Sequence, residues 1–178
     1  IDKDTKVNLE NFISNLIESK VNVEEIDLNN LILESSEIHK KISGYEFKRS
    51  ISAERFHHYN ELSDILRNGR LSDGENMSLS DYHYLFDHLE KHKNIFYNKI
   101  SSYDCIISPS ALGEAQSGLE YTGSPVLNTT WTLLGLPSIT LPMFKSKNNL
   151  PIGCQFISKK ADDNNLLSIS KKILLEFS

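Results

Sequence analysis

Three stretches in the second half of the chain decide its fold class: residues 103–110 read YDCIISPS, residues 122–137 read TGSPVLNTTWTLLGLP, and residues 150–157 read LPIGCQFI. The first and third are short apolar runs next to proline or glycine, which is typical of buried strands. The second contains an apolar helical run at 128–134 that is followed by Gly135 and Pro137, a pairing that commonly closes helices. These stretches predict a strand at 103–109, a loop, a short helix and further strands.

The same periodicities predict the remaining elements on both sides. Toward the C-terminus we expect strands at 138–143 and 152–158, a polar turn between them, and a helix that begins at Asp162 or Asp163. Toward the N-terminus we expect helices at 4–19, 29–50, 52–68 and about 78–100, a short strand at 21–28 and a turn or loop at 68–74. Helices that alternate with apolar strands indicate an α/β fold, with a mixed β-sheet flanked by helices and a hairpin formed by the last two strands.

A long loop at 110–127 joins the first of these strands to the short helix. It holds glycine or proline at four positions, namely Gly113, Gly118, Gly123 and Pro125, and few charges. Loops of this length in compact domains are usually functional or disordered. Because an apolar segment follows directly, we expect an ordered loop with a functional role.

The composition is that of a globular chain: 178 residues, 39% apolar and 24% charged, with a formal net charge of −5. This acidic balance disfavours a nucleic-acid coat or a polybasic membrane anchor, so neither partner is expected. No apolar run reaches the roughly 18 residues of a membrane-spanning helix, and no secretory leader is visible. The first residue is Ile1 rather than Met, so we expect a chain that was processed or cut from a longer one.

The residue types that most often carry chemistry give no complete site. His88 and His92 are four apart, but Leu89 occupies the place where a zinc helix of the HExxH kind carries glutamate, so a solvated helix face is the simpler interpretation and no metal is expected. Cys105 and Cys154 are interpreted as buried small hydrophobes in a reducing, cytoplasmic compartment, with a bridge or a reactive thiol as the alternatives. The serine pairs at 35–36 and 101–102 lie outside any glycine-rich loop, and neither a GxSxG nor a P-loop motif occurs.

The order of residues from 103 to 158 closely resembles the C-terminal part of amidase-signature enzymes, of the kind that includes the amidase component of glutamyl-tRNA amidotransferase. The matching elements are the D-x-I-I-S-P of residues 104–109, the T-G-x-P-x-x-N-x-x-W-T-L-L-G-L-P of residues 122–137 and the L-P-I-G-x-Q-x-I of residues 150–157. Weaker similarity at 1–5 and 78–82 extends the resemblance over residues 1–178. It implies the C-terminal segment of one amidase-signature domain, a fragment that lacks the N-terminal catalytic half.

The family hydrolyses amides, or transfers their nitrogen, with a Ser–cis-Ser–Lys triad, and it uses no metal or organic cofactor. The resemblance places that triad in the absent half, so no catalytic residue is expected in this chain. What it implies here is scaffold and substrate-pocket wall, with Tyr121, Thr122, Gly123 and Trp131 as candidate substrate-binding residues. The alternative is that Trp131 belongs to the core and Gly123 serves a turn. Gln116 and Ser124 stand where the family often carries proline and aspartate, which weakens any expectation that this loop recognises an amino group.

The complete protein is therefore expected to cleave a carboxamide C–N bond through an acyl-serine, with a small-molecule amide as substrate. Its N-terminal half or another subunit is the expected partner, and self-association is a further possibility. The first alternative is a non-catalytic pseudo-enzyme or partner-binding subunit of an amidase or amidotransferase complex. The second is a stand-alone hydrolase that uses a serine of this chain. The sequence does not identify the amide.

Overall fold

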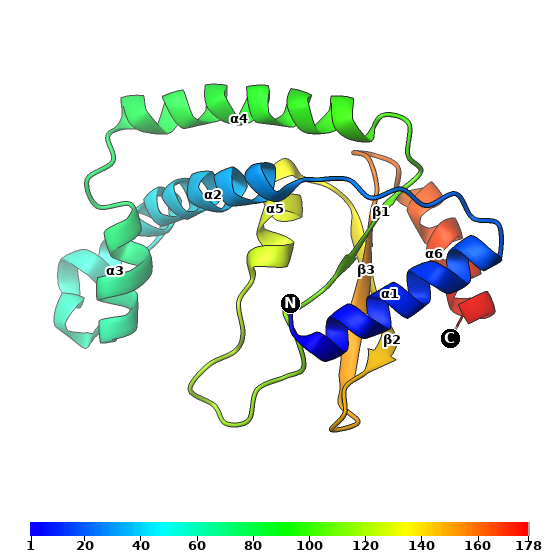
Figure 1. Cartoon of the computed structure of the whole chain (residues 1–178). Helices are drawn as coiled ribbons and strands as arrows, with labels where there is room; N and C mark the ends of the chain where they lie inside the picture. The colour runs from blue at the N-terminus through cyan, green and yellow to red at the C-terminus, as the bar shows by residue number, and fades with distance from the viewer. Residues whose placement is uncertain (178) are drawn as a thin grey trace. The chain divides into compact units, whose positions relative to one another are not determined.

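The computed structural model describes residues 1–177, which form helices and a small sheet (Figure 1). In chain order the elements are α1 (Lys3–Glu18), α2 (Asn29–Ser50), α3 (Ser52–His57), the 3₁₀ turn η1 (Tyr59–Glu61), the π-helical turn η2 (Leu66–Leu71), α4 (Leu79–Ile100), β1 (Ile106–Pro109), α5 (Val126–Leu134), β2 (Ser138–Lys145), β3 (Pro151–Ile157) and α6 (Asp163–Phe177). They belong to two compact units. The first comprises Ile1–Ile32 and the chain from Lys99 onward, and the second comprises Leu33–Asn98.

The sheet of the first unit has the strand order β1-β3-β2. Strand β3 is central, with Phe156 opposite Ile107 on one side and Ile139 on the other. The predicted hairpin of the last two strands is confirmed, and its turn passes through Asn149, which has a left-handed φ of 62°. The α/β class is confirmed as well. Every pairing among the described strands is antiparallel, so within residues 1–177 the sheet is antiparallel rather than mixed as predicted.

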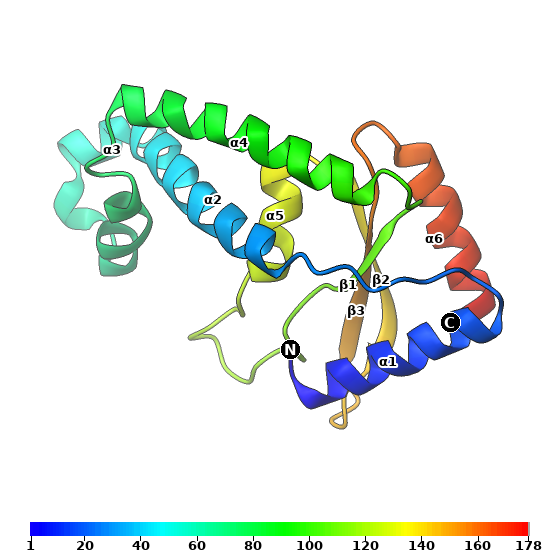
Figure 2. The ribbon, with the colours of Figure 1, turned by 45° about the horizontal axis from the view of Figure 1, so that its top comes forward.

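Each face of the sheet is covered by different helices. On one face, Cys154 and Phe156 of β3 pack with Phe12 of α1 and Leu166 of α6 in the main hydrophobic core. Side chains alternate along a strand, so Gln155 points to the opposite face, where its amide contacts Leu127 of α5. Two views of the ribbon show α1 and α6 on one side of the sheet and α5 on the other (Figures 1 and 2).

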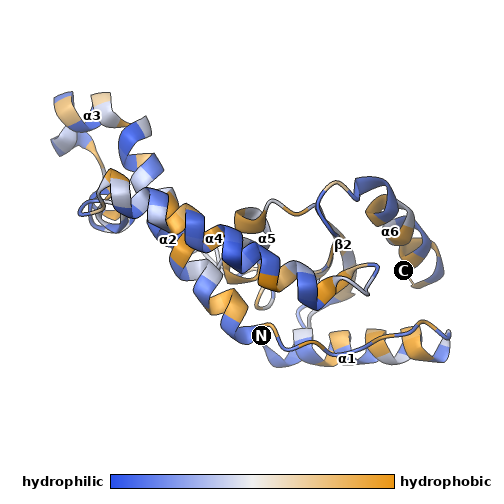
Figure 3. Cartoon of the chain, turned by 90° about the horizontal axis from the view of Figure 1, so that it is seen from above, coloured by the Kyte–Doolittle hydropathy of each residue, from blue (hydrophilic) through white to orange (hydrophobic). Residues whose placement is uncertain are grey.

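Helix α1 is capped by Asp2, whose side chain accepts a hydrogen bond from the Thr5 amide at 2.7 Å. Apolar bands recur along this helix, in agreement with the predicted stripe (Figure 3). The strand predicted at 21–28 is wrong. That segment pairs with none of the described strands; instead the Val21 amide donates to Leu16, and the Asp27 side chain accepts from the Asn29 amide.

In the second unit the predicted helices at 29–50 and about 78–100 are confirmed as α2 and α4. The single helix predicted at 52–68 is wrong: α3 ends at His57, Leu62 is extended, and η2 contains the non-helical Gly69. The apolar residues that suggested one helix are largely solvent-exposed, since Phe56 and Ile65 are 85% and 86% exposed. Within residues 1–177 no core buries that stripe, and the chain breaks into short turns. The loop predicted at 68–74 is largely helical, and only Gly74 begins a turn.

Among the helices of residues 1–177, none combines the length and the apolar composition that crossing a membrane requires.

Candidate functional site

The candidate site is built around the loop of residues 110–125, which leaves the end of β1 and returns at α5. At its base the Ser110 amide donates to the Gly153 carbonyl at 3.0 Å, which extends the β1–β3 pairing by one residue. The Asn128 side chain donates to the Ser110 carbonyl at 2.9 Å. A Cβ on Gly153 would collide with the Ser110 hydroxyl and the Thr140 methyl group. Gly153 therefore permits the close packing that this base requires.

A buried amide joins the two ends of the same loop. Gln155 is 1% exposed, and its Nε2 donates to the Pro109 carbonyl at 3.0 Å and to the Leu127 carbonyl at 2.8 Å. Both partners can only accept hydrogen bonds, so the amide nitrogen has to face them. Gln155 lies within the L-P-I-G-x-Q-x-I motif of residues 150–157, but the motif alone predicts no role for it. The available signal was a long polar side chain inside an otherwise apolar strand.

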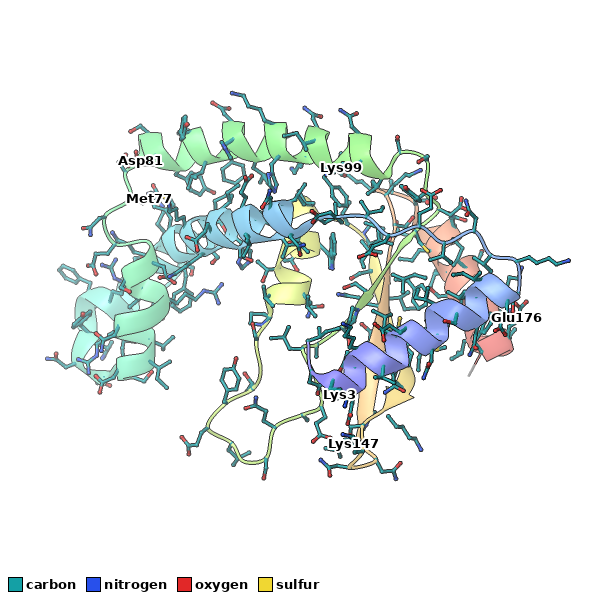
Figure 4. The ribbon with its side chains drawn as sticks, in the orientation of Figure 1. Lys3, Met77, Asp81, Lys99, Lys147 and Glu176 are labelled. Atoms are coloured by element: carbon teal, nitrogen blue, oxygen red, sulfur yellow. The ribbon has the colours of Figure 1, made fainter. Side chains whose placement is uncertain are left out.

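The first part of the loop is held by the start of α1 and by the β2–β3 turn. The Asp2 amide donates to the Leu112 carbonyl at 2.6 Å, and the Asn148 side chain donates to Glu114 at 2.6 Å. Hydrogen bonds from Thr5 hold the pKa of Asp2 below its usual value; the side-chain bond contributes most and the backbone bond second. Lys147 in the turn pairs with Asp4 of α1 at 3.4 Å, and Figure 4 labels this lysine beside the start of that helix.

The four residues predicted to form a pocket wall lie in two different environments. Tyr121, Thr122 and Gly123 are exposed on the later part of the loop, and the Tyr121 side chain is 54% exposed. Gly123 has a left-handed φ of 94° with open space around it, so a turn conformation is what requires glycine there. Trp131 on α5 is buried, with 4% of its surface exposed. The described chain therefore presents three of the four to solvent and places the fourth inside the first unit.

Ser124, where the family often has aspartate, accepts a hydrogen bond from the Val126 amide at 3.4 Å at the start of α5. A surface depression elsewhere on the first unit contains none of the candidate wall residues. It is lined by Ile100, Tyr103, Asp104, Cys105, Ile106, Ile157, Ser158 and Lys159.

A serine–histidine–carboxylate arrangement lies in the second unit, where sequence reasoning had found no nucleophile. Ser35 Oγ is 2.9 Å from His92 Nε2, and His92 Nδ1 is 3.3 Å from a Glu34 oxygen. The order of groups matches that of a serine hydrolase. However, Ser35 is 0% exposed, so a substrate cannot reach its hydroxyl. The arrangement joins α2 to α4 as a buried polar link.

Neither cysteine is suited to nucleophilic chemistry at neutral pH. Burial raises the pKa of Cys105 to about 11, with a further contribution from Asp104, and burial raises the pKa of Cys154 to about 12. Both thiols are free and protonated. Cys154 is buried, as predicted, whereas Cys105 is only partly buried. Within residues 1–177, His, Cys, Asp and Glu side chains form no group of three or more that suits a metal ion.

Comparison with known proteins places this geometry in a family. The family model for amidases matches residues 1–167, and the chain belongs to that family. Among curated proteins, the A subunit of the mitochondrial glutamyl-tRNA(Gln) amidotransferase of Ornithorhynchus anatinus is 26% identical over 146 residues, which cover 72% of this chain and 28% of that protein. The A subunit of the glutamyl-tRNA(Gln) amidotransferase of Orientia tsutsugamushi (strain Boryong) is 38% identical over 87 residues, which cover 45% of this chain and 18% of that protein.

Solved structures share the fold. A crystal structure of an amidase superimposes with a TM-score of 0.82 at 19% identity, covering 97% of this chain and 42% of that one. The allophanate hydrolase of Kluyveromyces lactis superimposes with a TM-score of 0.79 at 14% identity, covering 99% of this chain and 30% of that one. The chain thus has the amidase-signature fold and spans less than half the length of each of these relatives.

Proposed function

We propose that residues 1–178 form the C-terminal segment of one amidase-signature domain in a cytoplasmic hydrolase that cleaves a carboxamide C–N bond. In this proposal the segment supplies scaffold and one wall of the substrate pocket. The nucleophile and its base belong to a part of the enzyme outside this segment, either an N-terminal half or another subunit. The substrate is a small-molecule amide.

The observation that carries the proposal is the family match over residues 1–167, combined with the chemistry of the described side chains. The serine that lies beside a histidine is buried, and both thiols are protonated at neutral pH. A family member with this set of groups needs a nucleophile from elsewhere. The ordered base of the loop at 110–125 supports a role for this segment in shaping a pocket.

The proposed reaction proceeds in two steps that conserve atoms. A serine oxygen attacks the amide carbonyl, the C–N bond breaks, and the nitrogen leaves with a proton as ammonia or an amine. Water then attacks the acyl-serine, which releases the carboxylate and regenerates the hydroxyl. Hydrogen-bond donors that face the developing oxyanion lower both barriers.

The alternative is a non-catalytic subunit that binds and supports a partner in an amidase or amidotransferase complex. The similarity to the A subunits of amidotransferases from two organisms supports assembly with a partner. In this alternative the exposed residues of the loop contact a protein rather than a small molecule.

A hydrolysis assay on the full-length protein separates the two proposals. The protein is incubated with a panel of aliphatic and aromatic primary amides, and both ammonia and the matching carboxylate are quantified. The hydrolase proposal predicts equal amounts of the two products and saturation with substrate. Absence of turnover with every amide, together with stable co-purification of a second subunit, would favour the binding role.

A further inference from the structure

Gln155 is a fully buried amide on the central strand of the sheet, and the function proposed above leaves it without a task. Its neighbours along β3 are Cys154 and Phe156, which both belong to the main hydrophobic core. Burial of an amide is unfavourable unless its hydrogen-bonding groups find partners. The partners that Gln155 finds therefore indicate what the residue contributes.

Both partners are at the ends of one loop. Pro109 is the last residue of β1, immediately before residues 110–125, and Leu127 lies in the first turn of α5, immediately after them. A single amide nitrogen donates to both carbonyls, at 3.0 and 2.8 Å. The two carbonyls are thereby held within a few ångströms of each other, although a long loop separates them along the chain.

Two other polar contacts at this base also hold the ends of the loop in place. Asn128 bonds the carbonyl of Ser110, and Ser110 bonds the carbonyl of Gly153, next but one to Gln155 on β3. The loop beyond this base is different. Gly118 and Gly123 have left-handed φ values with open space around them, and Leu119 is 97% exposed. The direction in which the loop leaves the sheet is therefore set at its base.

We propose that Gln155 is a positioning residue for the substrate pocket: its buried carboxamide fixes both ends of the 110–125 loop and so places Tyr121, Thr122 and Gly123 against the amide substrate. The inference rests on the proposed hydrolase function. Gln155 acts through the loop and does not itself touch the substrate. Asparagine is one methylene shorter, and methionine has no donor, so neither maintains both bonds.

The test compares Gln155→Met with a matched control, Ser158→Ala, in the full-length protein. Ser158 is also buried at the end of β3, but its hydroxyl bonds the Asp104 carbonyl and the Asp162 carboxylate, away from the loop. Each variant removes one bridging polar group, from β3 in the first case and from the residue that follows β3 in the second. Both are measured well below their unfolding temperatures, so that the folded fractions are equal.

Two readouts distinguish positioning from general stability. In Gln155→Met, hydrogen exchange at the amides of Ser110, Asn128 and Thr129, which are bonded at the loop base, accelerates by about tenfold or more, while the Ser146 amide in the β2–β3 turn is unchanged. KM for the amide rises by about tenfold with kcat changed far less. In Ser158→Ala, exchange accelerates at Ser158 and Asp162, and KM is that of the wild type.

The possible outcomes distinguish a failure of the proposed hydrolase function from a failure of the positioning role of Gln155. If the wild type hydrolyses no amide, the proposed function fails, whereas the exchange at Ser110 and Asn128 still decides whether Gln155 holds the loop. If the wild type is active and Gln155→Met has wild-type exchange at the loop base, the positioning role is overturned. A KM that changes equally in Gln155→Met and Ser158→Ala also overturns it.

Discussion

Gly74 packs directly against the backbone of Gly44 in the middle of α2. A Cβ on Gly74 would collide with the Gly44 carbonyl group and with the Tyr45 amide, and a Cβ on Gly44 would lie 2.8 Å from the Gly74 nitrogen. Each glycine therefore leaves room for the other. A helix-interior glycine costs about 1 kcal/mol relative to alanine, and the close backbone contact accounts for its presence in α2.

This contact predicts that Gly74→Ala destabilises the second unit by roughly 1–3 kcal/mol, because the added methyl group overlaps backbone that cannot rotate away. Gly69→Ala is the matched control, since nothing lies within 4 Å of a Cβ placed there. Denaturant unfolding of both variants measures the difference. Equal stabilities of the two variants would show that Gly44 and Gly74 do not pack closely.

The Ser35–His92 contact gives a second prediction, which separates structure from catalysis. Ser35→Ala removes the hydroxyl that bonds a buried imidazole nitrogen, so the free energy of unfolding falls by about 1–3 kcal/mol. Amide turnover by the full-length protein is unchanged at temperatures where the variant is folded. Thermal unfolding and a hydrolysis assay measure the two quantities. Loss of turnover with unchanged stability would instead make Ser35 a catalytic residue.

The cysteine pKa values predict slow alkylation at neutral pH. Because burial raises the pKa of Cys105 to about 11 and that of Cys154 to about 12, the reactive thiolates are scarce in the folded protein below pH 9. These raised values stabilise the fold at and below the unfolded thiol pKa of 9.0, and the contribution is lost as the pH rises toward 11 and 12. Iodoacetamide labelling followed by mass spectrometry compares the alkylation rate of each cysteine in the folded protein with its rate in the urea-unfolded protein. Equal rates for folded and unfolded protein at pH 8 would contradict it.

The predicted pocket wall leads to a test at Tyr121. Because this side chain is 54% exposed, Tyr121→Ala should change the unfolding free energy by less than about 0.5 kcal/mol while it raises KM for the amide severalfold. Tyr84→Ala is the control, since Tyr84 is an exposed tyrosine of the second unit. Steady-state kinetics of the full-length protein measure both. A KM equal to that of Tyr84→Ala would remove Tyr121 from the pocket wall.

The sequence predicts correctly those elements in which a local signal, such as a helix-ending glycine, coincides with burial of the apolar side chains in a core. The helix at 128–134 was recognised from Gly135, and the structure gives that residue a left-handed φ of 66° at the helix end. The segment at 21–28 had the alternation of a strand, but none of the described strands pairs with it. The helix expected at 52–68 is wrong because Phe56 and Ile65 face solvent in the described structure rather than a core. Strand pairing and side-chain burial depend on the tertiary structure, so the periodicity of the sequence alone does not predict them.

The candidate site was predicted only in part, for a related reason. The loop and its glycines were visible as composition, but the bonds from Gln155 to Pro109 and Leu127 connect residues that the fold alone brings together. The contact of Ser35 with His92, 57 positions apart in the chain, was equally invisible. Whether Tyr121, Thr122, Gly123 and Trp131 line a pocket stays a prediction.

If the proposed hydrolase takes its nucleophile from outside residues 1–178, a fluorophosphonate probe will modify a serine elsewhere in the full-length protein. The full-length protein is labelled, digested, and the modified peptide is identified by mass spectrometry. The expected result is one stoichiometric serine adduct on a peptide outside residues 1–178, and none on Ser35. A stoichiometric adduct on any serine within residues 1–178 would contradict it.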